Sequence, residues 1–236
     1  MSEIITRQKS IIPACDVSLQ VYLDIIQATK DIPEVGGYKI GFQLGLGHGL
    51  PKIMELTRMF TEKPVMYDHQ KAGNDIPATG NNFAKTMEEG GIDTVIMFPF
   101  TGPVTARTWI DAAKDKGLNV IIGGRMTHEG FPISDEQVQE IYAIALEKGV
   151  TDFVMPGNQP TFVASQLADF KAKGITPTFY APGFVAQGGD ISETAQAAGD
   201  NWHAIIGRGL FWNKAEGRHN NLAEMKVAVE TLTSQL

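Results

Sequence analysis

The chain has 236 residues and a formal net charge of −7. Hydrophobic residues make up 43% and charged residues 20%, a composition typical of globular proteins that excludes a disordered chain. The negative charge argues against a protein that binds nucleic acid, because such affinity comes mainly from Lys and Arg on phosphates. No segment has the ~20 consecutive apolar residues that would span a bilayer. We therefore expect a soluble protein that binds neither nucleic acid nor a membrane.

Cysteine usage and the N-terminus indicate the compartment. Cys15 is the only cysteine, so an intrachain disulfide is excluded and nothing points to an oxidising environment. The N-terminal "MSEIITRQKS" lacks an apolar stretch of signal-peptide length. We expect a cytoplasmic protein in which Cys15, with no base beside it, is a core thiol. No linker or change of composition marks a boundary, so residues 1–236 are predicted to form a single domain.

Short β-branched runs recur along the chain, and each is followed by a longer stretch with helical spacing. The runs cover residues 11–17, 38–44, 64–69, 94–100, 119–126, 152–157, 176–183 and 203–209. Eight strand–helix units in steps of about 25 to 30 residues predict an α/β fold, the (β/α)8 TIM barrel. An open doubly wound sheet is the structural alternative. The barrel predicts chemistry at the C-terminal ends of its strands.

Two of the intervening stretches carry clear helix signals. In residues 134–149, Ser134 and Gln137 predict a capping box, and Gly149 predicts the end of the helix. One face of this helix is apolar, with Val138, Ile141, Tyr142 and Ala145. The stretch 102–117 shows the same spacing in Ala106, Trp109, Ile110 and Ala113. A last helix, from about 217 to 235, completes the predicted set.

Polar residues gather where the predicted strands end. They are Asp16, Lys39, Asp68, Lys71, Thr127, Pro182 with Gln187 beyond it, and Gly207 with Arg208. Each also has a structural interpretation: taken by itself, Asp16 could cap the helix that follows, because Asp at a strand-to-helix junction often does. Lys39 lies within an apolar run, and a buried lysine must be paired or neutral, so we favour a functional role.

Two glycine-rich turns predict an anion site. "GFVAQGGD" at 183–190 and "IIGRG" at 205–209 end the seventh and eighth predicted strands, where many barrels bind phosphate. Arg208 adds guanidinium donors suited to phosphate oxygens. Taken alone, a glycine-rich turn is more often only a loop. The histidines lie at no spacing typical of metal ligands, so no metal site is predicted.

Four motifs together resemble the orotidine 5′-monophosphate decarboxylase family. They are "DIPATG" at 75–80, "MTHEG" at 126–130, "PGFVAQGGD" at 182–190 and "IIGRG" at 205–209, and the similarity runs over nearly the whole chain. The resemblance implies a reaction without cofactor, the loss of CO2 from orotidine monophosphate to give uridine monophosphate. It also implies a homodimer whose sites take residues from both subunits.

The resemblance also implies roles for individual residues. Lys71 is similar to the family's catalytic lysine, Asp68 to the aspartate before it on the third strand, and Lys39 to the lysine that touches the ribose and joins the charged network. Asp75 and Thr79 resemble the pair that reaches into the partner's site. The remaining positions resemble substrate contacts. Asp16 resembles the aspartate that binds the ribose, and Thr127 stands where the family usually has a serine that contacts the pyrimidine. The phosphate contacts are resembled by Gln187, Gly207 and Arg208, and Pro182 lies at the mouth of the barrel.

The spacing around Lys71 departs from the family pattern. The family usually has one residue between aspartate and lysine and two before the next aspartate, whereas "DHQKAGND" has two and three. In a regular strand, Asp68 would then share its face with Gln70, and Lys71 would point the other way. Either a β-bulge or the end of the strand redirects Lys71, or Gln70 takes the lysine's place and catalysis fails. We favour the bulge, and Gly73 gives the backbone further freedom.

Two rival functions remain open at this point. A metal-dependent sugar-phosphate decarboxylase or aldolase of the same barrel superfamily would share Asp68, Lys71, Asp75 and the phosphate site. Magnesium-dependent activity on a keto-sugar phosphate would favour it. A non-catalytic nucleotide-binding relative would bind uridine monophosphate without turnover.

Overall fold

The protein is described by a computed structural model covering residues 4–69, 74–128, 130–184 and 187–236. Over these ranges, eight parallel strands form a closed barrel in sequential order. They are β1 (Lys9–Cys15), β2 (Tyr38–Gly41), β3 (Val65–Asp68), β4 (Thr94–Met97), β5 (Asn119–Gly123), β6 (Asp152–Val154), β7 (Thr178–Ala181) and β8 (Trp202–Ile206). The barrel closes where β1 pairs with β8, from Lys9 opposite Trp202 to Pro13 opposite Ile206. The predicted (β/α)8 barrel is confirmed.

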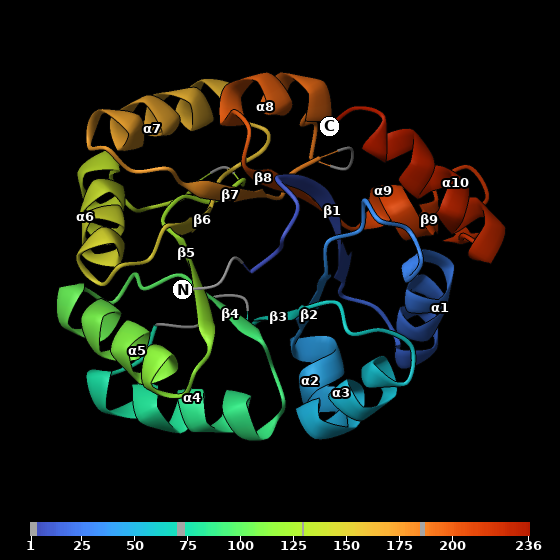
Figure 1. The fold of residues 1–236 in the computed structure, drawn as a ribbon, viewed down its shortest axis with the longest axis horizontal. Coiled ribbons are helices and arrows are strands. Elements are labelled where there is room, and N and C mark those ends of the chain that lie inside the picture. Colours follow the sequence, from blue (N-terminus) through green and yellow to red (C-terminus); the bar gives the residue numbers. More distant parts are fainter. Residues whose placement is uncertain (1–3, 70–73, 129, 185–186) are drawn as a thin grey trace.

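Helices follow the strands and form a ring around the barrel (Figure 1). They are α1 (Leu19–Thr29), α2 (Phe42–His48), α3 (Leu50–Arg58), η1 (Pro77–Thr79), α4 (Gly80–Glu89), α5 (Pro103–Asp115), α6 (Asp135–Glu147), α7 (Pro160–Ala172), α8 (Ile191–Ala198), α9 (Arg208–Phe211) and α10 (Leu222–Thr233). A short hairpin of β9 (Trp212–Asn213) and β10 (Arg218–His219) lies between α9 and α10.

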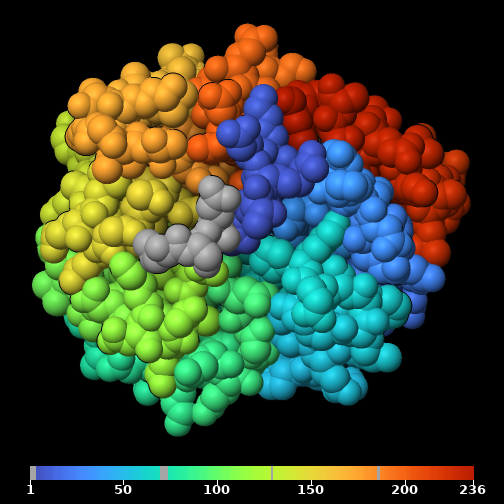
Figure 2. All heavy atoms as spheres, in the orientation of Figure 1, coloured from blue at the N-terminus to red at the C-terminus, as the bar shows by residue number. Residues whose placement is uncertain are grey.

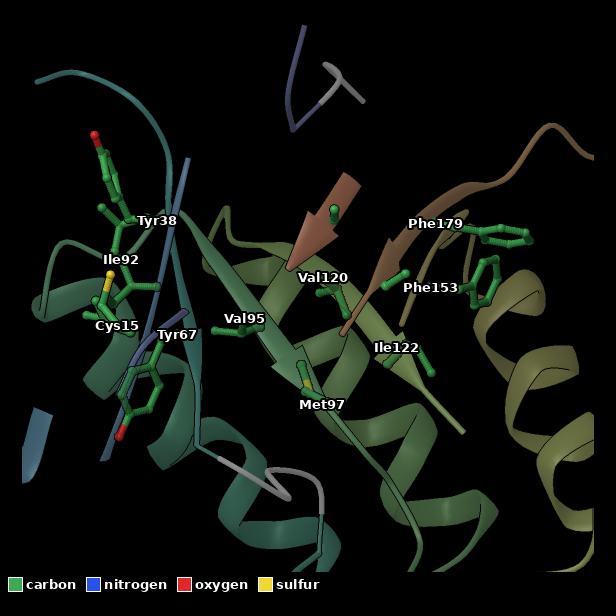
Figure 3. Packing of buried hydrophobic residues seen from close by; sticks show 14 of the residues in the cluster. Cys15, Tyr38, Tyr67, Ile92, Val95, Met97, Val120, Ile122, Phe153 and Phe179 are labelled. Carbon is green, nitrogen blue, oxygen red and sulfur yellow. The ribbon is translucent and has the colours of Figure 1, made fainter. Parts of the chain in front are cut away.

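Apolar side chains occupy two separate layers, because successive residues of a strand point to opposite faces. The inner layer fills the barrel and includes Ile12, Met66, Ile96, Ile121, Val154 and Ile205. The outer layer packs between the strands and the helices, and Figure 3 shows part of it, with Val95, Met97, Val120, Ile122, Phe153 and Phe179. Both faces of the sheet are therefore buried, which explains the nearly continuous apolar strands.

Helix signals in the sequence are confirmed for α6. Ser134 accepts a hydrogen bond from the Gln137 backbone, and the Gln137 side chain returns one to the Ser134 backbone, which completes the capping box. Gly149 follows the helix with φ +68°, a conformation that glycine adopts without strain. The predicted apolar faces of α5 and α6 are both buried.

The second predicted strand, 38–44, is wrong beyond Gly41. The chain turns at Gly41, and α2 begins at Phe42. The apolar residues that follow are not all buried: Leu44 packs in the core, whereas Phe42 and Leu46 are exposed. An apolar run of this length does not distinguish a strand from a short helix, which explains the error.

The N-terminal segment lies across the end of the barrel opposite the C-terminal ends of the strands. Ile5 is 7% exposed and packs with the inner layer, and Ile4 and Ile5 lie near the starts of β5, β6 and β7. Figure 2 shows this segment, coloured blue, over the middle of the ring. Among the described residues, none of the helices is long and apolar enough to cross a membrane.

Candidate active site

A cavity of about 410 Å³ opens at the C-terminal ends of the strands. Eight residues singled out from the sequence line it: Asp16, Lys39, Asp68, Thr127, Pro182, Gln187, Gly207 and Arg208. They come from six of the eight strands, or from the segments directly after them. The barrel therefore brings these residues, which are far apart in the sequence, into one cavity.

Lys39 lies between two carboxylates on one side of this cavity. Its Nζ is 3.2 Å from Asp16 Oδ2 and 3.1 Å from Asp68 Oδ2, and its side chain is 7% exposed. Burial acts to lower the pKa of Lys39, but the negative charges of Asp68 and Asp16 outweigh it and hold this pKa above its usual value. The two carboxylates therefore favour the ammonium form of Lys39, and two charge-assisted hydrogen bonds fix its position.

Strand register and one glycine produce this cluster. Lys39 on β2 lies opposite Ala14, and Gly41, two residues on, lies opposite Asp68 of β3. A Cβ on Gly41 would be 2.3 Å from Asp16 Oδ1, so only glycine leaves room for that carboxylate. The residue that caps α1 is Ser18 and not Asp16, so the capping interpretation of Asp16 is wrong.

The opposite side of the cavity is formed by the ends of β7 and β8. Gly183 has φ +114°, and its carbonyl accepts a hydrogen bond from Gly189 N at 3.0 Å, which brings residues 183 and 189 together. Within the described ranges, the exposed guanidinium of Arg208 makes no ion pair. A cation without a protein partner, together with Gln187, can bind an anionic group in the cavity.

Between the two polar sides, the cavity wall is apolar, and the sequence analysis missed it. The wall includes Ile96, Phe98, Met126, Val154 and Phe211. Phe98 lies across β5 because Gly123 has no side chain there: a Cβ would come within 2.1 Å of the Phe98 ring. In a sequence, apolar residues at strand ends look like core residues. Only the combination of Phe98 with a glycine at the end of the neighbouring strand, Gly123, could have indicated this wall.

Two neighbouring amide side chains hold the segment that carries Thr127. Asn158 Nδ2 donates to the Thr127 carbonyl at 2.9 Å, and Gln159 Nε2 donates to the Met126 carbonyl at 3.1 Å. Both amides follow β6, the strand next to β5. The position of Thr127 at the cavity is therefore set by the neighbouring loop.

Asp75 and Thr79 lie elsewhere. Both line a second, more apolar groove of about 600 Å³ on the outside of the barrel, between α2, α3 and α4. The backbone N–H of Ile76 donates to Asp75 Oδ1 at 2.7 Å. The structure does not place these two residues in the cavity of the same chain.

Lys71, Gln70 and Gly73 lie outside the described residues, so the predicted bulge stays a prediction. Cys15 is fully buried, and burial raises the pKa of its thiol, in keeping with a core thiol. In the ranges that the structure covers, no group of three His, Cys, Asp or Glu side chains is arranged to hold a metal ion.

Closed parallel strands with a charged cluster and an exposed arginine at their C-terminal ends define a (β/α)8 barrel of the enzyme type. The family model described as "Orotidine 5′-phosphate decarboxylase / HUMPS family" matches residues 10–218. The chain therefore belongs to this family.

Individual relatives support the same family assignment. Orotidine 5′-phosphate decarboxylase of Methanosarcina barkeri is 32% identical over 95% of both chains, and that of Methanosarcina acetivorans is 33% identical over 82% of this chain and 83% of its own. A crystal structure of orotidine 5′-monophosphate decarboxylase from Methanocaldococcus jannaschii, complexed with the inhibitor BMP, superposes with a TM-score of 0.80. It is 25% identical and covers 96% of this chain and 99% of its own.

Proposed function

We propose that the protein is an orotidine 5′-monophosphate decarboxylase that releases CO2 and forms uridine 5′-monophosphate without a cofactor. The observation that carries the proposal is the Asp16–Lys39–Asp68 cluster, which lies in the same cavity as the exposed Arg208. Polar groups at the two ends of an apolar cavity suit a nucleotide whose ribose and phosphate are polar and whose base is flat.

The phosphate is assigned to the Arg208 end. Gln187 and Gly207 lie there with Arg208, so side-chain and backbone donors can surround an anion. The pyrimidine is assigned to the apolar wall, where Thr127 supplies a polar contact. Asp16 and Lys39 are assigned to the ribose hydroxyls, because a carboxylate and an ammonium can accept and donate hydrogen bonds to them.

The reaction breaks the bond between C6 and the carboxylate and leaves its electron pair on C6. A proton donor must then supply a proton to C6, and Lys71 is the residue we assign to this role. Asp16, Lys39 and Asp68 together carry one more negative than positive charge, so a further ammonium beside Asp68 would be favoured electrostatically. A cation at this point would also stabilise the developing carbanion.

The active form is proposed to be a homodimer. The groove that Asp75 and Thr79 line is separate from the cavity of their own chain, and Leu46 beside it is 74% exposed. An apolar groove with exposed leucine fits the surface of a second copy. Asp75 and Thr79 would then reach the partner's cavity, and the partner's residues would reach this one.

A decarboxylation assay with orotidine monophosphate tests the proposal. We expect activity without added metal, loss of at least about a thousandfold in Arg208→Ala or Lys71→Ala, and little change in the exposed surface variant Lys173→Ala. Mixing inactive Lys71→Ala with inactive Asp75→Ala should restore activity, because a mixed dimer holds one intact site. Wild type that binds uridine monophosphate but releases no CO2 would contradict the proposal.

A further inference from the structure

The segment that carries Asp75 is fastened to the neighbouring strand by a side-chain amide. Asn74 Nδ2 donates to the Phe98 carbonyl at 2.7 Å, and Asn74 Oδ1 accepts from the Phe100 backbone N–H at 2.9 Å. The two bonds run in opposite directions to backbone groups just beyond β4. Asn is suited to this position, because its short side chain presents one donor group and one acceptor.

Two further bonds extend this attachment along the segment. Thr105 Oγ1 donates to the Asp75 carbonyl at 3.1 Å, and Trp109 Nε1 donates to the Ile76 carbonyl at 3.2 Å. Thr105 and Trp109 are buried residues of α5, 4% and 6% exposed. Residues 74, 75 and 76 are therefore each bound to the rigid β4–α5 unit.

The attachment connects the groove and the cavity. Asp75 lines the groove, whereas Phe98, whose carbonyl Asn74 binds, places its ring in the cavity wall. Asn74 is the last of the three residues that separate Lys71 from Asp75, one more than the family pattern has. The amide therefore fixes Asp75 relative to the cavity wall, whatever the length of the segment before it.

We propose that Asn74 is a positioning residue: its amide holds Asp75 at the place from which it serves the decarboxylation site of the partner subunit. This inference rests on the proposed function. It predicts that a small displacement of Asp75 lowers kcat more than it weakens substrate binding. The reason is that Asp75 acts near the reacting carbon, which is remote from the phosphate.

The test compares Asn74→Ala with Asn119→Ala, whose amide also donates to a backbone carbonyl but at the other end of the barrel. We expect kcat for orotidine monophosphate to fall at least about tenfold in Asn74→Ala, with KM changed less than about threefold, since an error near 1 Å can cost about 10²-fold. Asn119→Ala should keep the wild-type kcat. Hydrogen exchange of the Phe100 amide should accelerate only in Asn74→Ala.

A second variant keeps the test informative if Asn74→Ala fails to fold. Asn74→Asp keeps the acceptor for Phe100 but loses the donor to Phe98, and only its protonated form, with an O–H in place of the N–H, can make both bonds. Its kcat relative to wild type should therefore rise as the pH falls toward the pKa of the new carboxyl.

Two outcomes would overturn the inference and are distinct from failure of the proposed function. One is an active wild type whose Asn74→Ala variant folds and keeps its kcat. The other is an Asn74→Asp variant whose relative kcat does not depend on pH. A wild type with no decarboxylase activity would instead overturn the proposed function, and the role of Asn74 in it.

Discussion

At the scale of single residues, two of the buried titratable groups, Lys39 and His203, have opposite surroundings. Lys39 is charged because Asp16 and Asp68 lie within 3.2 Å of its Nζ. His203 instead pairs with a neutral hydroxyl, because its Nδ1 lies 2.8 Å from Ser10 Oγ in a hydrogen bond. The first group belongs to the cavity, whereas the second lies among the strands of the barrel.

His203 makes the folded protein sensitive to acid. Burial lowers its pKa to about 3, whereas an unfolded histidine titrates near 6.5. Between these values the unfolded chain binds a proton that the folded chain does not, so stability falls as the pH falls. This residue should contribute about 1.4 kcal/mol per pH unit below pH 6.

Urea unfolding of wild type and His203→Gln at pH 7 and pH 5 measures this contribution. The variant should lose less stability on acidification than wild type, whatever its stability at pH 7. Equal losses in the two proteins would show that other groups, such as the Tyr180–Asp152 pair beside it, control the acid response.

At the scale of elements, β2 shows how backbone space determines a side-chain position. Asp16 follows β1, but the place of its carboxylate depends on Gly41 at the end of β2. The sequence indicated both Asp16 and Lys39 as functional candidates. It did not show that a glycine two residues after the lysine, on the same face of the strand, leaves room for the carboxylate.

Gly41→Ala should displace Asp16 without unfolding the barrel. The new Cβ would lie 2.3 Å from Asp16 Oδ1, and the flexible end of that side chain would move and lose its bond to Lys39. We expect kcat/KM for orotidine monophosphate to fall by about tenfold or more. The measurement is steady-state kinetics together with thermal unfolding.

Gly47→Ala in α2 is the matched control, because a Cβ there meets nothing within 4 Å. It should keep its kinetics and gain about 0.5–1 kcal/mol of stability from the better helix former. If the Gly41→Ala protein turned over substrate normally, the position of Asp16 would not matter to the reaction.

At the scale of the whole molecule, the barrel could be predicted from the sequence. Its apolar strands recur at regular intervals, and each is followed by a stretch with helical spacing, in two clear cases ended by glycine. Strand order followed from the fold alone. Phe98 and the rest of the apolar wall could not be predicted, because an apolar strand end can face either layer. The separation of Asp75 from the cavity of its own chain could not be derived from periodicity either; only the family resemblance of "DIPATG" implied a role at a partner's site.

The groove beside Asp75 predicts the response to a surface charge. Leu46→Asp should separate the proposed dimer and reduce activity at low protein concentration, because it places a carboxylate in an apolar contact. Val227→Asp on α10, where the native residue is 60% exposed, is the control. Sedimentation velocity should show monomers for the first variant alone; dimers in both would place the interface elsewhere.

Closure of the barrel by β1 and β8 has a consequence during synthesis. Asp16 leaves the ribosome early, and Arg208 leaves near the end, yet both border one cavity only after the first and last strands have paired. A nascent chain that ends before Trp202 has neither the final strand nor the guanidinium. The complete cavity therefore forms only after most of the chain has been synthesised, and a product truncated before Trp202 lacks the side of the cavity that β8 and Arg208 provide.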